Sequence, residues 1–97
     1  MEKKTTRIEL GNGYYKIIIY WSNRRIDKKD VMYFNSNNVL HRLDGPARIS
    51  FYPNGTIYYN TYCISGVFYD TKEDWENSPE LIKLRNIEIN LKLLNKV

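Results

Sequence analysis

The stretch of sequence that decides the fold is residues 40–56, LHRLDGPARISFYPNGT. It reads as a strand, a stiff turn, a second strand and an Asn-Gly hairpin turn. Leu40, Arg42 and Asp44 are spaced by two residues, so Arg42 and Asp44 project from the same face of an extended chain. This pattern predicts antiparallel hairpins and says little about activity.

The turn inside this stretch is expected at Asp44-Gly45-Pro46. Asp44 can close an Asx-type turn with its side chain, glycine permits a positive φ, and proline fixes its own φ where no backbone donor is needed. We therefore expect Gly45 to have a positive φ. On that basis a Gly45→Val variant is expected to lose about 1 kcal/mol or more of stability, because a β-branched residue is strained there.

Turn signals recur throughout the first seventy residues and separate short apolar runs, which is typical of an antiparallel β-meander. The expected strands are Thr6–Leu10, Tyr14–Trp21, Val31–Phe34, Val39–Leu43, Ala47–Tyr52, Thr56–Ile64 and Val67–Tyr69. An internal repeat underlies them, since Asn12-Gly13 with the run after it parallels Asn54-Gly55 with the next run. The second copy is one residue longer, so one copy is expected to carry a β-bulge.

The character of the chain changes after Asp70. Thr71 with Asp74 approximates a capping box, and Ser78-Pro79-Glu80 offers a second helix start. Apolar residues from Leu81 onward follow helical spacing, although residues 86–94 also alternate as a strand would. The predicted fold is therefore β-rich (α+β), a single domain over residues 1–97, with an antiparallel sheet over 6–70 and a helical segment over 71–97.

Residues 37–47, NNVLHRLDGPA, resemble the short MORN-like hairpin repeats, with Asn38 where glycine is usual. Asparagine tolerates the left-handed conformation better than most residues. Residues 62–69 resemble the next repeat, and residues 71–75 resemble the short helix that often closes such arrays. The resemblance covers about residues 31–80. It implies an antiparallel meander of hairpin repeats and an origin in bacteriophages or large DNA viruses, and it supplies no catalytic residue.

Composition narrows the function classes. The chain has one cysteine and one histidine, a net charge of +4, and nine tyrosines. An intramolecular disulfide and a thiolate metal cluster are therefore excluded. We expect structural roles for His41 and Cys63, no metal, no cofactor and no enzymatic activity. No apolar run approaches membrane-spanning length, so the sequence predicts no membrane contact and an intracellular location. With the viral origin that the resemblance implies, this location is the host cytoplasm.

The candidate binding residues combine aromatic rings with arginines, a pairing suited to base stacking or to a protein hot spot. They are Trp21, Arg24, Arg25, Arg42, Arg48 and Tyr58. Replacing Arg24 and Arg25 together by alanine is expected to leave thermal stability nearly unchanged and to weaken partner binding about tenfold or more.

Three functional hypotheses follow from these residues and from the resemblance. The first is a non-catalytic binding protein, encoded by a virus, that contacts a host or viral protein and inhibits host defence. The second is a sponge that sequesters an anionic nucleotide-derived signal, and the third is nucleic-acid binding. The run Tyr14–Trp21 is almost continuously apolar, as in a strand covered on both faces. The second face of this strand is expected to pack against either the C-terminal helix or another subunit. Homo-oligomerisation is therefore one of the two alternatives.

Overall fold

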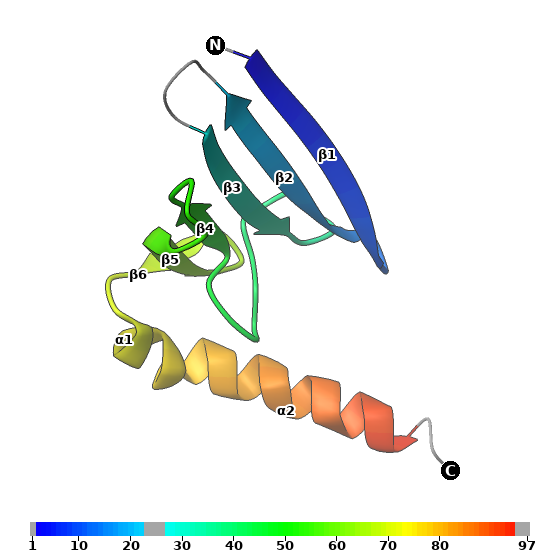
Figure 1. Ribbon diagram of the computed structural model, residues 1–97. Coiled ribbons are helices and arrows are strands. Elements are labelled where there is room, and N and C mark those ends of the chain that lie inside the picture. The colour runs from blue at the N-terminus through cyan, green and yellow to red at the C-terminus, as the bar shows by residue number, and fades with distance from the viewer. Residues whose placement is uncertain (1, 23–26, 95–97) are drawn as a thin grey trace.

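The computed structural model describes residues 2–22 and 27–94. In this part of the chain six strands form one antiparallel meander in sequence order, and two helices follow (Figure 1). The strands are β1 (Glu2–Gly11), β2 (Tyr14–Ser22), β3 (Asp27–Phe34), β4 (Arg48–Phe51), β5 (Ile57–Ile64) and β6 (Val67–Tyr69), and the helices are α1 (Lys72–Glu76) and α2 (Pro79–Leu94). The predicted β-rich meander with a C-terminal helical region is confirmed.

The hairpin turns form because their central residues accept positive φ. Asn12 and Gly13, between β1 and β2, have φ values of 57° and 82°. Ser65 and Gly66, between β5 and β6, have φ values of 49° and 84°. Two-residue turns with positive φ at both positions match the right-handed twist of the flanking strands. Asn38 also adopts the left-handed conformation, with φ 64°, as expected.

The expected bulge lies in β5, the longer copy of the internal repeat. Ser50 of β4 pairs with Tyr59, whereas the next residue, Phe51, pairs with Ile57. Tyr58 is therefore the extra residue of the bulged strand. In a regular strand Tyr58 and Tyr59 would project to opposite sides of the sheet, so the bulge changes which side chains can meet.

The predicted strand over residues 39–43 is wrong. Leu40 forms only an isolated bridge with Phe34 of β3, and the Arg42 N–H donates to the Cys63 carbonyl of β5 at 3.1 Å. The segment thus bonds to β3 on one side and to β5 on the other, and it reaches the next turn before a ladder develops. Hydrogen bonding divided between two neighbours satisfies the backbone without producing a strand.

The prediction of a positive φ at Gly45 is also wrong, since Gly45 is not among the residues in that conformation. Glycine is needed there for another reason. The guanidinium of Arg42 packs on it so closely that a Cβ would lie 3.0 Å from Cζ of Arg42. Arg42 is held in place because its Nε donates to Asp44 Oδ1 at 2.7 Å and its Nη1 donates to the Pro46 carbonyl at 3.1 Å.

Both predicted helix starts are confirmed. The hydroxyl of Thr71 accepts from the Asp74 N–H at 3.0 Å, and Thr71 is the N-cap of α1. The hydroxyl of Ser78 accepts from the Leu81 N–H at 3.2 Å, directly before Pro79 opens α2. The alternative of a strand over residues 86–94 is excluded, because α2 continues to Leu94.

A small core joins the helices to the end of the sheet. Ile64, Trp75 and Leu81 are buried together, and the Tyr62 and Trp75 rings lie 4.7 Å apart. Each such aliphatic or aromatic side chain contributes about 1.5–3 kcal/mol when fully buried. Tyr62 and Ile64 project from one side of β5, so the helices occupy that side and Tyr59, by alternation, points to the other.

Candidate functional site

Strand register brings a group of aromatic and lysine side chains to the side of the sheet opposite the helices. Asp30 pairs with Ser50 and Ser50 with Tyr59, so these three residues share a side. Lys28 lies two residues before Asp30 on the same side, and it pairs with Trp21, which in turn pairs with Lys3. We call this surface the aromatic–lysine face and define it as Lys3, Trp21, Lys28, Tyr52, Tyr58 and Tyr59.

The three tyrosines of the aromatic–lysine face form a contiguous cluster. The ring centroids of Tyr52 and Tyr58 lie 5.0 Å apart, and those of Tyr58 and Tyr59 lie 6.3 Å apart. Each of the three residues is 47% to 50% exposed. The cluster exists because of the bulge, which places Tyr58 on the side of Tyr59. Aromatic rings gathered at a half-exposed surface contribute little to the core and are well placed for binding.

Lysine ammonium groups lie over the rings of this face. Lys28 Nζ lies 4.9 Å from the centroid of the Tyr58 ring. Lys3 Nζ lies 5.0 Å from the centroid of the Trp21 ring. Both distances fall within the range of cation–π attraction. The face therefore alternates positive charge with aromatic rings from β1 across to β5.

A buried carboxylate fixes the orientation of Trp21. The indole Nε1–H donates to Asp30 Oδ2 at 2.9 Å, and the hydroxyl of Ser50 donates a short hydrogen bond to Asp30 Oδ1. Asp30 and Ser50 are both buried. Burying a carboxylate is costly unless its oxygens are hydrogen-bonded, and here both oxygens accept. The result is a tryptophan whose ring is held in place at the surface rather than free to rotate.

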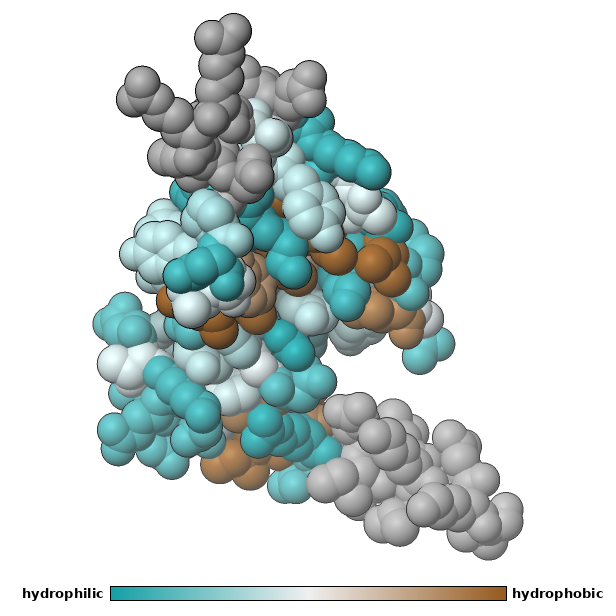
Figure 2. All heavy atoms as spheres, in the orientation of Figure 1, coloured by the Kyte–Doolittle hydropathy of each residue, from teal (hydrophilic) through white to brown (hydrophobic). Residues whose placement is uncertain are grey.

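The face is electropositive. Among the described residues that project from this side of β2 to β5, Asp30 is the one carboxylate, and its oxygens are already engaged. Arg48 pairs with Met32, two residues from Asp30, so it also projects from this side. On β1, Arg7 and Glu9 share the side of Lys3, and they form an ion pair with each other. Figure 2 shows hydrophobic residues only as separate patches with hydrophilic side chains between them.

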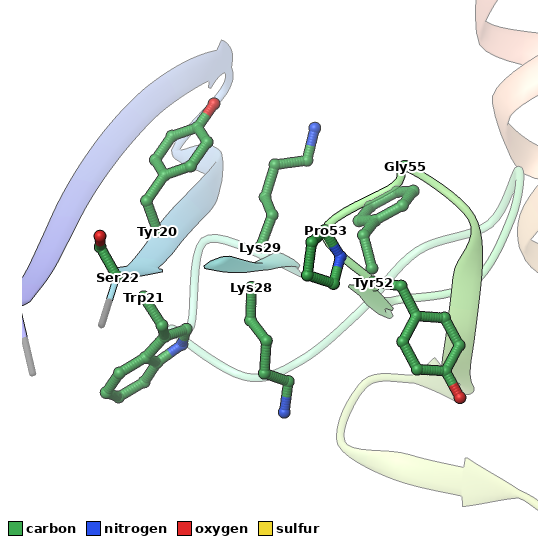
Figure 3. Close-up of a pocket in the computed structure, with 9 residues that line it drawn as sticks. Tyr20, Trp21, Ser22, Lys28, Lys29, Tyr52, Pro53 and Gly55 are labelled. Carbon is green, nitrogen blue, oxygen red and sulfur yellow. The ribbon is translucent and has the colours of Figure 1, made fainter. Parts of the chain in front are cut away.

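An open cleft of about 480 Å³ borders the face where the sheet divides. β3 and β4 pair only from Lys29–Phe51 to Met32–Arg48, so beyond Lys29 the β2–β3 hairpin and the β4–β5 turn separate. Figure 3 shows Trp21, Lys28 and Tyr52 pointing to one side of this cleft and Tyr20 and Lys29 to the other. The cleft thus opens onto both sides of the sheet.

The predicted site residues fall into three groups. Trp21, Arg48 and Tyr58 share the side of the sheet described above. Arg42 lies elsewhere, with its Cζ 4.0 Å from the centroid of the Tyr33 ring and its donors engaged near Gly45. Arg24 and Arg25 lie outside the described residues, so their binding role stays a prediction.

Sequence reasoning missed several residues of this surface. They are Lys3, Asp30, Ser50 and Tyr52. Period-two spacing does place Lys28 with Asp30 and Tyr52 with Ser50 on one side of their own strands. That signal could not join β3 to β4, because the pairing register was unknown.

The side chains of His41 and Cys63 are buried and hydrogen-bonded to the backbone. The Ser65 N–H donates to His41 Nδ1 at 2.9 Å, and burial lowers the pKa of the imidazole below its ordinary value. The Cys63 thiol is buried and donates to the Leu40 carbonyl at 3.2 Å. Burial raises the pKa of this thiol, which keeps it protonated and poorly nucleophilic. Both side chains tie the residue 40–42 segment to the β5–β6 hairpin.

Within residues 2–22 and 27–94, no group of three or more His, Cys, Asp or Glu side chains is arranged to hold a metal ion. The described helices include none with the length and apolar character needed to span a membrane. Comparison of the chain with protein-family models, curated proteins and solved structures finds no match. The function is therefore inferred from the surface itself.

Proposed function

We propose that this chain is a non-catalytic binding protein that contacts a macromolecule through the aromatic–lysine face. The observation that carries the proposal is the half-exposed cluster of Tyr52, Tyr58 and Tyr59 beside a tryptophan held by the buried Asp30. Rigid aromatic anchors next to cations dominate binding hot spots. An ordered anchor also binds at a lower entropic cost than a mobile one.

The source and setting of this binding protein are proposed from the resemblance to MORN-like repeats. Residues 37–47 carry that signature, and a meander of hairpins accords with it. Under this proposal the protein is encoded by a bacteriophage or a large DNA virus. It acts in the host cytoplasm on a host or viral macromolecule, as an inhibitor of host defence.

The proposal is tested by using the tagged protein as bait in a host lysate and comparing it with two single variants. Tyr58→Ala removes the central ring of the cluster, and Phe68→Ala removes a more exposed ring, 63% against 47%, on β6. Circular dichroism first establishes that both variants are folded. We expect Tyr58→Ala to recover about tenfold less partner, because truncating a hot-spot aromatic costs about 2 kcal/mol or more. Equal recovery with both variants would contradict the proposed surface.

The cleft beside Trp21 favours one alternative, a sponge for an anionic nucleotide-derived signal. Its volume of about 480 Å³ lies in the range of small-ligand sites, about 300–1,000 Å³. Lys28, Lys29 and Phe51 are among its lining residues and offer phosphate contacts and a stacking surface. Mass spectrometry of small molecules released by denaturing the purified protein tests this alternative. A nucleotide retained by the wild type and lost from Lys29→Ala would favour the sponge.

A further inference from the structure

We propose that the partner of the aromatic–lysine face is a single-stranded nucleic acid. This inference rests on the proposed function and names the chemistry of its partner. Unpaired bases stack on Tyr52, Tyr58 and Trp21, and phosphates between them pair with Lys3, Lys28 and Arg48. The structure supports this assignment through ring exposure, charge and the spacing of the rings across the sheet.

The rings offer the surfaces that base stacking needs. Tyr52 and Tyr58 are about half-exposed, with centroids 5.0 Å apart and planes inclined by 49°, so they present separate ring faces rather than one closed stack. Stacking does not depend on base identity because every base has a π-face. Lys28 lies over the Tyr58 ring in the free protein. Its flexible side chain can move to a phosphate when a base takes its place.

The charge of the face suits a polyanion. Lys3, Lys28 and Arg48 reach this side from three different strands, β1, β3 and β4. Asp30 would repel phosphates, but it is buried and both of its oxygens accept hydrogen bonds. A phosphate chain crossing the sheet would therefore meet cations on each side of the rings. An acidic protein segment would account for the lysines and leave the ring faces unexplained.

The shape of the face favours a single strand over a duplex. Trp21 on β2 and Tyr59 on β5 are three strand spacings apart across the sheet, roughly 14 Å at about 4.8 Å each, and they are also offset by two residues along the strands. Open sheets with exposed aromatic residues stack about two or three unpaired bases. Reading a duplex requires a helix or ribbon that enters a groove. The aromatic–lysine face is one side of a sheet, and the described residues that form it offer no projecting helix or ribbon that could enter a groove.

Fluorescence anisotropy tests the inference with three fluorescein-labelled probes of about twelve nucleotides, a length within the usual site size of single-strand binders. The probes are an oligouridylate, an oligothymidylate and a mixed-sequence DNA duplex. Titrations run at several salt concentrations between about 50 and 200 mM. Equal binding of the two single strands indicates stacking and phosphate contacts alone, and tighter RNA binding adds a 2′-hydroxyl contact; both outcomes support the inference.

The variants are chosen as matched pairs. Tyr58→Ala is expected to weaken single-strand binding about tenfold, whereas Tyr58→Phe should retain it because the ring alone stacks. Lys28→Ala should lower the slope of log affinity against log salt by about 0.7, the value for one phosphate contact on a single strand. Lys83→Ala removes the same charge from the exposed surface of α2 and should leave both the affinity and the slope unchanged.

Three results would overturn the inference. They are absence of saturable binding of either single strand, duplex binding as tight as single-strand binding, and equal affinities for the wild type and Tyr58→Ala. The lysate experiment separates this failure from failure of the proposed function. If the probes do not bind and Tyr58→Ala still loses its lysate partner, the face binds a protein. If Tyr58→Ala keeps both the wild-type affinity for the single-stranded probes and the wild-type recovery of lysate partner, both proposals fail.

Discussion

Adding one methyl group at Gly45 should destabilise the protein through Arg42 and not through backbone strain. The new Cβ would lie 3.0, 3.1 and 3.3 Å from Cζ, Nη1 and Nε of Arg42. These separations are too short for ordinary carbon contacts, so the guanidinium must move. A shift of a few tenths of an ångström would weaken its hydrogen bond to the Pro46 carbonyl, its ion pair with Asp44 and its contact with the Tyr33 ring.

The size of the effect follows from these three contacts. The hydrogen bond from the charged guanidinium is worth about 1.5–3 kcal/mol, and the cation–π contact about 0.5–1 kcal/mol. The ion pair adds little, because the Asp44 side chain is 83% exposed. Replacing glycine by alanine restores about 0.4–1 kcal/mol by restricting the unfolded chain. Because these contacts are weakened and not removed, we expect Gly45→Ala to lose about 1 kcal/mol.

A double-mutant cycle by urea denaturation distinguishes the two causes. Gly45→Ala is measured in the wild type and in an Arg42→Ala background, where the guanidinium is absent. We expect the alanine at position 45 to be neutral there, or stabilising by about 0.4–1 kcal/mol. Gly45→Val is still expected to destabilise the wild type, for the same steric reason. An equal loss from Gly45→Ala in both backgrounds would refute the Arg42 explanation and restore backbone strain as the cause.

Two further predictions concern buried polar groups. Burial lowers the pKa of His41 below 6.5, so the unfolded chain binds a proton more readily, and stability should fall as the pH decreases below about 6.5 toward the folded pKa. Urea denaturation between about pH 5 and 8 checks this, and a wild-type profile no steeper than that of His41→Ala would contradict it. Asp30→Ala leaves the Trp21 and Ser50 donors without their acceptor, so it should destabilise by about 2 kcal/mol or more and red-shift the Trp21 fluorescence. Ser50→Ala, the matched control, should cost less and keep the emission, and an unchanged emission maximum in Asp30→Ala would count against Asp30 as the group that orients Trp21.

The local elements of the fold could be predicted because neighbouring residues determine them. Asn12-Gly13 forms a two-residue hairpin turn because asparagine and glycine both tolerate positive φ. Thr71 caps a helix through a hydroxyl three residues from its donor. The difference in length between the two repeats indicated a bulge in one of them, and the structure places it in β5. The strand expected over residues 39–43 failed because its hydrogen bonds are divided between β3, which directly precedes it, and β5, which lies well after it in the chain.

The sequence by itself identified two aromatic residues of the proposed binding surface, Trp21 and Tyr58. Only the tertiary structure decided which cations join them, because strand register places Lys3 and Lys28 beside these rings. It also gave Asp30 its role, since nothing near Asp30 in the chain shows that both of its carboxylate oxygens accept from other strands. The physical reason is the same in each case. Turns and caps depend on contacts within a few residues, whereas the face depends on pairing between strands, which no local pattern specifies.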